Sequence, residues 1–206
     1  ISVIYNGIDH SIFKPYNIKL LDKPYILYVG SERPRKNLSR LFEAFAKLKG
    51  EFPELKLAKV GISGRSKKHR RETMRKLVSL GLTRDVIFVE TFCELDLAYY
   101  YPSPFNINYP SLYEGFGFPS LEAMACGCPV VTSNTSSLPE VVGEAGIMVN
   151  PYDTNGLAQA MRRVLTDDKL RDDMVRKGLE QAKRFSWEKA ARETLEVYNK
   201  VAQGGN

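Results

Sequence analysis

Two kinds of hydrophobic pattern alternate along the chain. Short runs rich in β-branched and aromatic residues, bounded by turn residues, predict six buried strands at 25–30, 55–60, 86–89, 105–109, 129–133 and 146–149. Between these runs, apolar residues recur with helical spacing. After the last run the pattern is wholly helical and predicts helices over 154–165, 167–184 and 187–201.

Two of the intervening helices can be bounded from the sequence. The first is expected to begin after Asn37, a favourable N-cap residue, and to stop at Gly50. Its apolar face is formed by Leu38, Leu41, Phe42, Phe45 and Leu48. The second spans 67–80 and ends at Gly81, and its expected buried face consists of Met74, Leu77 and Val78.

This alternation predicts a Rossmann-like α/β fold, with a doubly wound parallel six-stranded sheet followed by C-terminal helices. The common strand order 3-2-1-4-5-6 places the ligand crevice beyond the carboxyl ends of strands one and four. We therefore expect the site in the loops after Gly30 and Tyr109. We divide the chain into an interdomain linker over 1–22 and one domain over 23–206.

Composition narrows the function classes. The 206 residues are 43% hydrophobic and 26% charged, which excludes a collagen, a mucin and a fully disordered chain. The net charge of +6 favours an anionic ligand. Three cysteines and two histidines leave little material for a zinc site or a Ser-His-Asp hydrolase, so we expect reduced thiols, no metal and no resident cofactor. The start at Ile1 lacks a signal-peptide profile, and we expect a piece of a cytoplasmic protein.

The loop after the first strand is rich in cations. It carries Arg33, Arg35 and Lys36 immediately before the expected N-terminus of a helix. Free backbone N–H groups, the positive end of the helix dipole and fixed cations all favour a phosphate there. The alternative is an ordinary solvated loop.

The loop after the fourth strand combines glycines with carboxylates. Gly115 and Gly117 permit close backbone approach to a ligand, and Glu114 and Glu122 stand on either side with seven residues between them. The loop is not a dinucleotide-binding G-x-G-x-x-G motif, because Ser120 occupies the third glycine position.

The run from Glu114 to Glu122, continued through residues 123–131, resembles the E-x7-E signature of retaining glycosyltransferases of the two-Rossmann-domain (GT-B) type, family 4. Gly30-Ser31 followed by residues 34–37, and the segments 6–9 and 13–15, are similar to other motifs of that family. The resemblance spans nearly the whole chain. It implies a donor-binding C-terminal half, with the acceptor-binding N-terminal half absent from this chain.

The resemblance also implies roles for individual residues. Glu122 is expected to bind the ribose hydroxyls of a nucleotide sugar, Glu114 to face the transferred sugar, and Lys36 to neutralise the leaving diphosphate. Many relatives have arginine where this chain has Ser31, so the second cation is expected to be Arg33 or Arg35. The other positions expected around the donor are Ser31, Gly115, Phe116, Gly117, Phe118 and, near the base, Thr91, Phe92 and Cys93.

The basic run at residues 67–71 contains no interleaved aromatic residue, so we expect a solvated face or contact with a membrane surface, and no nucleic-acid partner. We therefore expect the protein in the cytoplasm, with a peripheral position at the inner face of the membrane as the alternative.

Taken together, the residues and the resemblance predict the donor-binding half of a retaining glycosyltransferase that moves a hexose from a GDP-, UDP- or ADP-sugar. Mannose is favoured because the loop at 31–37 resembles that of bacterial and archaeal mannosyltransferases. The fragment alone is expected to be inactive. The alternatives are a nucleotide-sugar epimerase of the same architecture, a hydrolase using Glu114 and Glu122 as an acid and base, and a non-catalytic nucleotide-binding or nucleic-acid-binding module.

Overall fold

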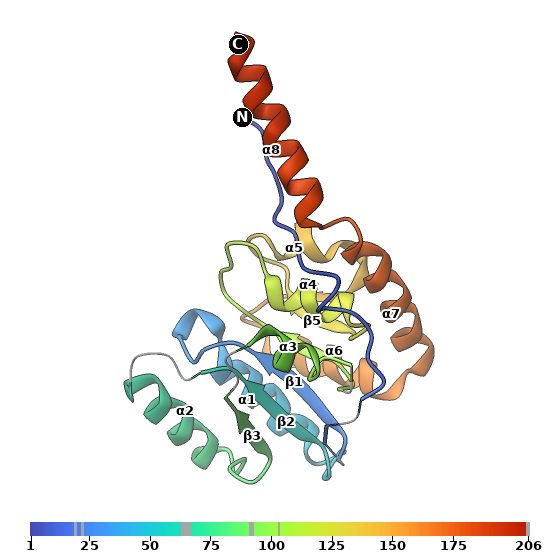
Figure 1. The fold of residues 1–206 in the computed structure, drawn as a ribbon. Coiled ribbons are helices and arrows are strands. Elements are labelled where there is room, and N and C mark those ends of the chain that lie inside the picture. The colour runs from blue at the N-terminus through green and yellow to red at the C-terminus, as the bar shows by residue number, and fades with distance from the viewer. Residues whose placement is uncertain (19, 22, 63–66, 91–92, 103, 205–206) are drawn as a thin grey trace.

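The computed structural model describes residues 1–18, 20–21, 23–62, 67–90, 93–102 and 104–204. Within these ranges six parallel strands form one sheet in the order β3-β2-β1-β4-β5-β6 (Figure 1). The strands are β1 (Tyr25–Val29), β2 (Lys56–Val60), β3 (Val86–Val89), β4 (Ile107–Tyr109), β5 (Val130–Ser133) and β6 (Ile147–Val149). The predicted strand order is confirmed, and every predicted strand is present with bounds that differ by two residues or fewer.

Helices cover both faces of the sheet. They are α1 (Leu38–Leu48), α2 (Lys67–Ser79), α3 (Glu94–Ala98), α4 (Phe118–Ala125), α5 (Leu138–Val142), α6 (Thr154–Thr166), α7 (Asp168–Ala182) and α8 (Trp187–Ala202), with short 3-10 turns η1 (Pro34–Lys36) and η2 (Gly143–Ala145). Helices α1 and α6 pack together on one face, and α4 and α7 on the other. Because side chains alternate along a strand, Ile26 and Tyr28 of β1 pack on the face covered by α1 and α6. Leu27 packs on the opposite face, with α4.

The C-terminal helices begin at side-chain caps, which satisfy N–H groups that have no partner within the helix. Asp153 Oδ1 accepts from Gly156 N at the start of α6, and Asp167 Oδ1 accepts from Leu170 N at the start of α7, each at 2.9 Å. Ser186 caps α8 in the same way. Caps of this kind stabilise a helix by ~0.5–2 kcal/mol each, which explains why the three helices begin within a residue of their predicted starts.

The buried face predicted for α2 is wrong in two of its three residues. Leu77 is buried, whereas Met74 is 38% exposed and Val78 is 66% exposed. The helix covers the β3 edge of the sheet and buries only the narrow stripe of Thr73 and Leu77. Met74 and Val78 lie outside this buried stripe and are exposed.

The N-terminal segment is anchored where α8 begins. Ile8 forms a parallel bridge with Ser186, and a Cβ on Gly7 would overlap Trp187 N, so only glycine fits this crossing. Ile8 and Phe13 are buried in the core. The role of residues 1–22 as an interdomain linker stays a prediction.

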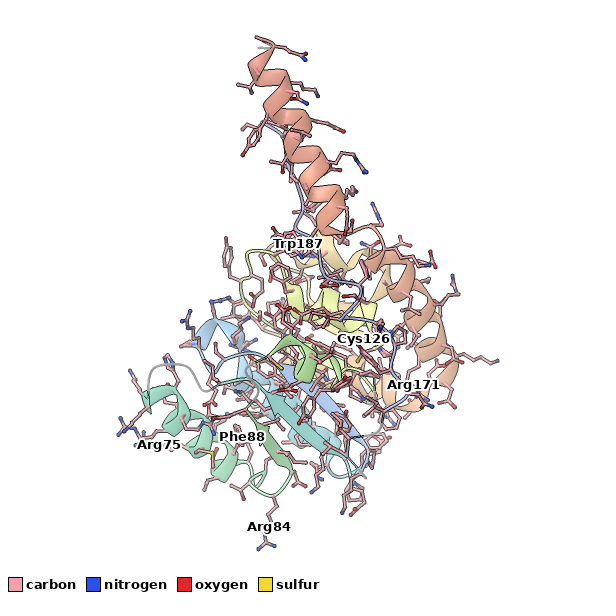
Figure 2. The ribbon with its side chains drawn as sticks, viewed as in Figure 1. Arg75, Arg84, Phe88, Cys126, Arg171 and Trp187 are labelled. Carbon is pink, nitrogen blue, oxygen red and sulfur yellow. The ribbon has the colours of Figure 1, made fainter. Side chains whose placement is uncertain are left out.

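Helix α8 projects from the body with the first residues of the chain beside it (Figure 1). None of its described residues is buried, and its exposed apolar residues include Trp187, at the base of the helix (Figure 2), Leu195, Tyr198 and Val201. Among the described residues, no helix combines the length and the apolar character that crossing a membrane requires.

Candidate active site

The two loops singled out in the sequence meet at the carboxyl edge of the sheet. Strands β1 and β4 are neighbours, with Leu27 opposite Ile107, although they are far apart in sequence. The winding direction of the sheet reverses between them, which creates the crevice in which doubly wound domains bind their ligands.

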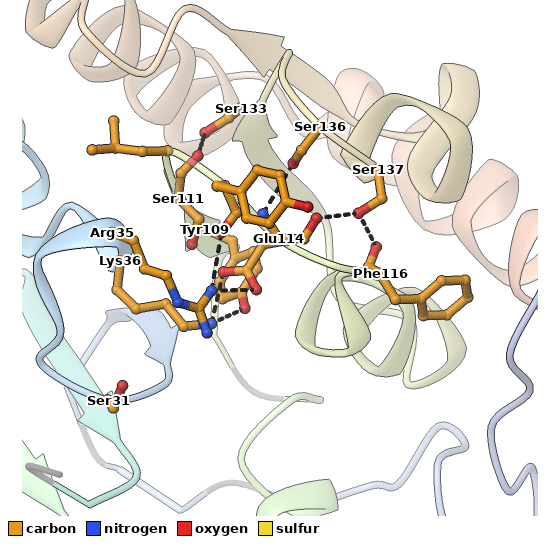
Figure 3. Close-up of polar contacts among 12 residues, drawn as sticks. Ser31, Arg35, Lys36, Tyr109, Ser111, Glu114, Phe116, Ser133, Ser136 and Ser137 are labelled. Atoms are coloured by element: carbon orange, nitrogen blue, oxygen red, sulfur yellow. Dashed lines mark hydrogen bonds and ion pairs between the residues drawn. The ribbon is translucent and has the colours of Figure 1, made fainter. Parts of the chain in front are cut away.

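An ion cluster joins these loops (Figure 3). Lys36 Nζ lies 2.7 Å from Glu114 Oε1, and Arg35 Nη1 lies 3.0 Å from Glu114 Oε2. Lys36 also donates to the hydroxyl of Tyr109 and lies over its ring, 4.6 Å from the centroid. The structure therefore brings together Lys36, Glu114 and Arg35. Arg33 is exposed, and the ion pairs described for this cluster do not include it.

Burial and pairing set the charge states of the cluster. Burial lowers the pKa of Lys36, and the hydrogen bond that Lys36 donates to Glu114 opposes this shift. Burial pushes the pKa of Glu114 upward, but the hydrogen bond and charge of Lys36 outweigh it, so that the pKa lies below its ordinary value. Glu114 is thus held as a carboxylate between two cations.

Asn37 holds the cluster in place through its side chain. Its amide Nδ2 donates to Pro110 O at 2.9 Å and to Pro151 O at 2.7 Å. Asn37 is at the N-cap position of α1 as predicted, but it has φ 59° and its side chain makes no capping hydrogen bond. The side chain does not cap the helix because its amide nitrogen donates to two carbonyls from distant loops and its Oδ1 accepts from Arg40 Nη1 at 3.0 Å.

Hydroxyl groups that follow β5 hold the Glu114 loop from the other side. Ser136 Oγ accepts from Glu114 N at 3.0 Å, and Ser137 Oγ donates to Glu114 O and to Phe116 O. Further hydroxyl-to-carbonyl bonds along the same loop come from Thr132, Ser133 and Thr135. Sequence reasoning missed these residues, although five of the six residues at 132–137 carry a hydroxyl group, which was a visible signal.

The glycine loop leads directly into α4. Gly117 has φ 106°, a conformation that favours glycine, and a Cβ there would lie 2.7 Å from Leu138 Cδ2. Gly115 is exposed and has open space around it. The rings of Phe116 and Phe118 pack on each other with centroids 5.1 Å apart, and the expected place of these residues around the donor stays a prediction. Helix α4 begins at Phe118, with Pro119 in its first turn.

Glu122 lies on α4 in a different environment from Glu114. Its Oε2 accepts a 2.6 Å hydrogen bond from the hydroxyl of Tyr101. Burial raises the pKa of Glu122 to about 7, with the Tyr101 hydrogen bond opposing the rise and the charge of Glu94 adding to it. Sequence reasoning assigned no chemistry to the tyrosines at 99–101 and therefore missed this contact.

A cavity of about 410 Å³ opens at the carboxyl ends of β1 and β2. It is lined in part by Gly30, Ser31, Cys93 and Glu94. Ser31 lies apart from the ion cluster (Figure 3). Thr91 and Phe92, expected near the base, lie outside the described residues. A larger cavity of about 730 Å³ lies between α1 and α2, and neither lining includes Lys36, Glu114 or Glu122. We place the site at the smaller cavity because it opens at the carboxyl ends of the strands, and because a Cβ on Gly30, in its lining, would lie 3.7 Å from Lys36 Cε.

Buried charges beneath the cavity join the loops that frame it. Lys59 and Glu32 have fully buried side chains 3.6 Å apart, and Arg70 Nη2 lies 2.9 Å from the same Glu32 oxygen. Lys59 donates to the carbonyl groups of Gly61 and Ile62, which line the cavity. Arg70, from the basic run at 67–71, is therefore partly engaged in the fold. Sequence reasoning missed this network.

In the described part of the chain, no group of three or more His, Cys, Asp or Glu residues is placed to hold a metal ion. The cysteines at 126 and 128 are buried, with Cys126 inside the body (Figure 2), and Cys93 is exposed.

An open parallel sheet with a cation and carboxylate site at its switch point defines a doubly wound ligand-binding domain. The chain belongs to the glycosyl transferases group 1 family, whose model matches residues 11–181. It is 39% identical over 180 residues to O-antigen chain mannosyltransferase B from Escherichia coli, a match that covers 84% of this chain and 45% of that protein.

Solved structures agree with this assignment. Sucrose-phosphate synthase from Thermosynechococcus elongatus superposes with a TM-score of 0.86 at 31% identity, covering 98% of this chain and 52% of that one. HepE from Anabaena, in complex with UDP-glucose, has the same fold, with a TM-score of 0.87 at 21% identity over 97% of this chain and 57% of that one. The chain spans about half the length of the curated relatives it matches.

Proposed function

We propose that this chain is the donor-binding half of a retaining glycosyltransferase that moves a hexose from a nucleoside diphosphate sugar. One observation carries the proposal: Lys36 and Arg35 converge on Glu114 at the switch point of the sheet, next to the loop of Gly30 and Ser31 that lines the cavity. Cations suit a diphosphate and a carboxylate suits sugar hydroxyls, so one cluster presents both chemistries that a sugar nucleotide requires.

Lys36 and Arg35 would stabilise the negative charge that develops on the departing diphosphate. Lys36 is buried, and a fixed cation in such a site is worth more than the same cation in water. Glu114 is its partner before the donor binds. A diphosphate would compete for Lys36, and the carboxylate of Glu114 would then accept hydrogen bonds from the hydroxyls of the transferred sugar.

Glu122 would hold the nucleotide through its ribose. A carboxylate accepts hydrogen bonds only, and it can take the protons of two vicinal hydroxyls. The N-terminus of α4, four residues earlier, would direct its positive end toward the diphosphate. Retention requires attack on the same sugar face that the diphosphate leaves, and we assign that assistance to the departing phosphate.

The donor proposed first is GDP-mannose, with UDP- and ADP-sugars as the alternatives. The similarity to O-antigen chain mannosyltransferase B supports mannose. HepE, whose crystal structure contains UDP-glucose, supports a nucleotide sugar in this fold.

We also propose that an acceptor-binding domain completes the enzyme. The exposed apolar residues along α8 supply a surface for it, and the matched relatives are about twice as long as this chain. On this proposal the 206-residue chain binds nucleotide but transfers no sugar alone.

A panel of nucleoside diphosphates tests the proposal. A ligand present at a hundred times its dissociation constant stabilises a protein by ~2.7 kcal/mol, which thermal unfolding detects readily. We expect GDP, UDP or ADP to stabilise the chain, and the full-length protein to transfer a hexose from the matching donor. Stabilisation by none of them would reject the donor site. Conversion of the sugar nucleotide without any acceptor would favour an epimerase, and sugar transfer by the 206-residue chain alone would refute the need for a second domain.

A further inference from the structure

Tyr101 lies beneath Glu122 and is fixed by packing. Its side chain is fully buried, and its ring meets Phe13 edge-on with centroids 6.3 Å apart. Its hydroxyl donates to Glu122 Oε2 at 2.6 Å. Because the ring has no room to move, the direction of this hydrogen bond is set by the fold.

We propose that Tyr101 is the positioning residue of Glu122: its hydroxyl occupies Oε2 and leaves Oε1 to accept from the ribose of the nucleotide. The inference rests on the proposed function for its ligand, but the contact itself is independent of it. Tyr101 reaches this position from the turn after α3, whereas Glu122 lies on α4, so the hydrogen bond joins that turn to the helix.

The hydrogen bond also supports the charged form of Glu122. A donor to a carboxylate stabilises the ionised state, and the hydrogen bond from the Tyr101 hydroxyl lowers the pKa of Glu122. Burial and the carboxylate of Glu94, on α3, act in the opposite direction. The Cys126 thiol, one helical turn further along, has its own pKa raised in part by Glu122. Because the pKa of Glu122 lies near neutral pH, the Tyr101 hydroxyl helps to keep this carboxyl ionised. Only the ionised carboxylate acts purely as a hydrogen-bond acceptor.

Binding of ribonucleotide should therefore depend on pH through Glu122. Affinity is expected to be highest above pH 7, where the carboxyl is ionised, and to fall as the pH drops through the pKa of about 7. Without the Tyr101 hydroxyl the pKa rises, so the pH at which binding is half lost moves upward. Glu94→Gln should move it downward, because a charge that raises the pKa has been removed.

The test compares wild type with Tyr101→Phe in the full-length protein. Calorimetry from pH 5.5 to 8.5 uses GDP or UDP, whichever the wild type binds, and the matching 2′,3′-dideoxy diphosphate. At pH 7.5 we expect Tyr101→Phe to weaken ribonucleotide binding about tenfold, the loss expected for one hydrogen bond to a charged group, and to leave dideoxynucleotide binding nearly unchanged. Tyr16→Phe is the matched control, because it removes a hydroxyl that donates to Ile12 O instead.

Equal losses for both nucleotides, or no loss for either, would overturn the positioning role while leaving the donor site standing. Failure of the wild type to bind any nucleotide would instead reject the proposed function. The contact is then tested by carbon NMR of the Glu122 carboxyl in ligand-free protein. We expect Tyr101→Phe to raise its titration midpoint, and an unchanged midpoint would refute the inference.

Discussion

Glu122 is expected to lower the free energy of unfolding of the ligand-free protein above neutral pH. Its pKa is about 7 in the folded chain against an ordinary value of 4.5, because burial disfavours its charge. Below pH 4.5 the carboxyl is protonated in both states, and its favourable contribution to folding is fully present. As the pH rises through 7 that contribution is lost. The difference between the two pKa values corresponds to ~3 kcal/mol.

Glu122→Gln removes this pH dependence. The glutamine carbonyl can still accept the Tyr101 hydrogen bond, and the side chain keeps its size but carries no charge. We expect the free energy of unfolding of the variant to exceed that of wild type by up to ~3 kcal/mol at pH 8 and to differ little at pH 5. The same variant should bind ribonucleotide about tenfold more weakly or worse, because the amide presents a donor where an acceptor is needed.

Urea titrations followed by circular dichroism at pH 5 and pH 8 measure the difference. The exposed Glu144→Gln is the matched control, and we expect it to change unfolding little at either pH. A variant that is less stable than wild type at pH 8, or that differs from it equally at both pH values, would refute the reasoning.

Three further outcomes follow from single sites. Lys36→Ala should weaken nucleoside diphosphate binding by ~1.5–3 kcal/mol and nucleoside binding much less, by calorimetry, with the exposed Lys47→Ala as control. Gly7→Ala should destabilise by ~3 kcal/mol in urea titrations, because its Cβ overlaps the backbone at the start of α8, whereas Gly50→Ala, which has open space, should not. Cys93 should be the one thiol that reacts rapidly with a disulfide reagent, since burial raises the pKa of both other cysteines.

Each of these has a clear contrary result. Equal losses for nucleoside and diphosphate would remove Lys36 from the phosphate site. A Gly7→Ala protein as stable as wild type would show that the chain crossing relaxes readily. A rapidly reacting thiol that persists in Cys93→Ser would contradict the burial of the other two.

The sheet could be read from the sequence because each strand is a local pattern, and the alternation with helices restricts how strands can be ordered. The candidate site residues of the loops after β1 and β4 could be predicted for the same reason, because each loop is also a local pattern. Their partners could not. Ser136 contacts Glu114, and Tyr101 contacts Glu122, across more than twenty residues of sequence, and periodicity carries no information about such pairs.

The orientation of α2 shows a different limit of the sequence pattern. Met74, Leu77 and Val78 satisfy helical spacing, but so does the pair Thr73 and Leu77, and only the packed edge of the sheet decides between them. Helix α2 lies at the edge of the fold, and it buries fewer residues than its apolar pattern would allow.

The side-chain amide of Asn37 has a consequence for engineering. It joins the turn that carries Lys36 to the carbonyl of Pro110 and, on the far side of the sheet reversal, to that of Pro151 at the start of the α6 segment. A loop exchanged alone would leave a buried amide or carbonyl without its partner. Transplanting the sugar-nucleotide preference of a relative onto this scaffold should therefore succeed only when all three loops are grafted as one piece.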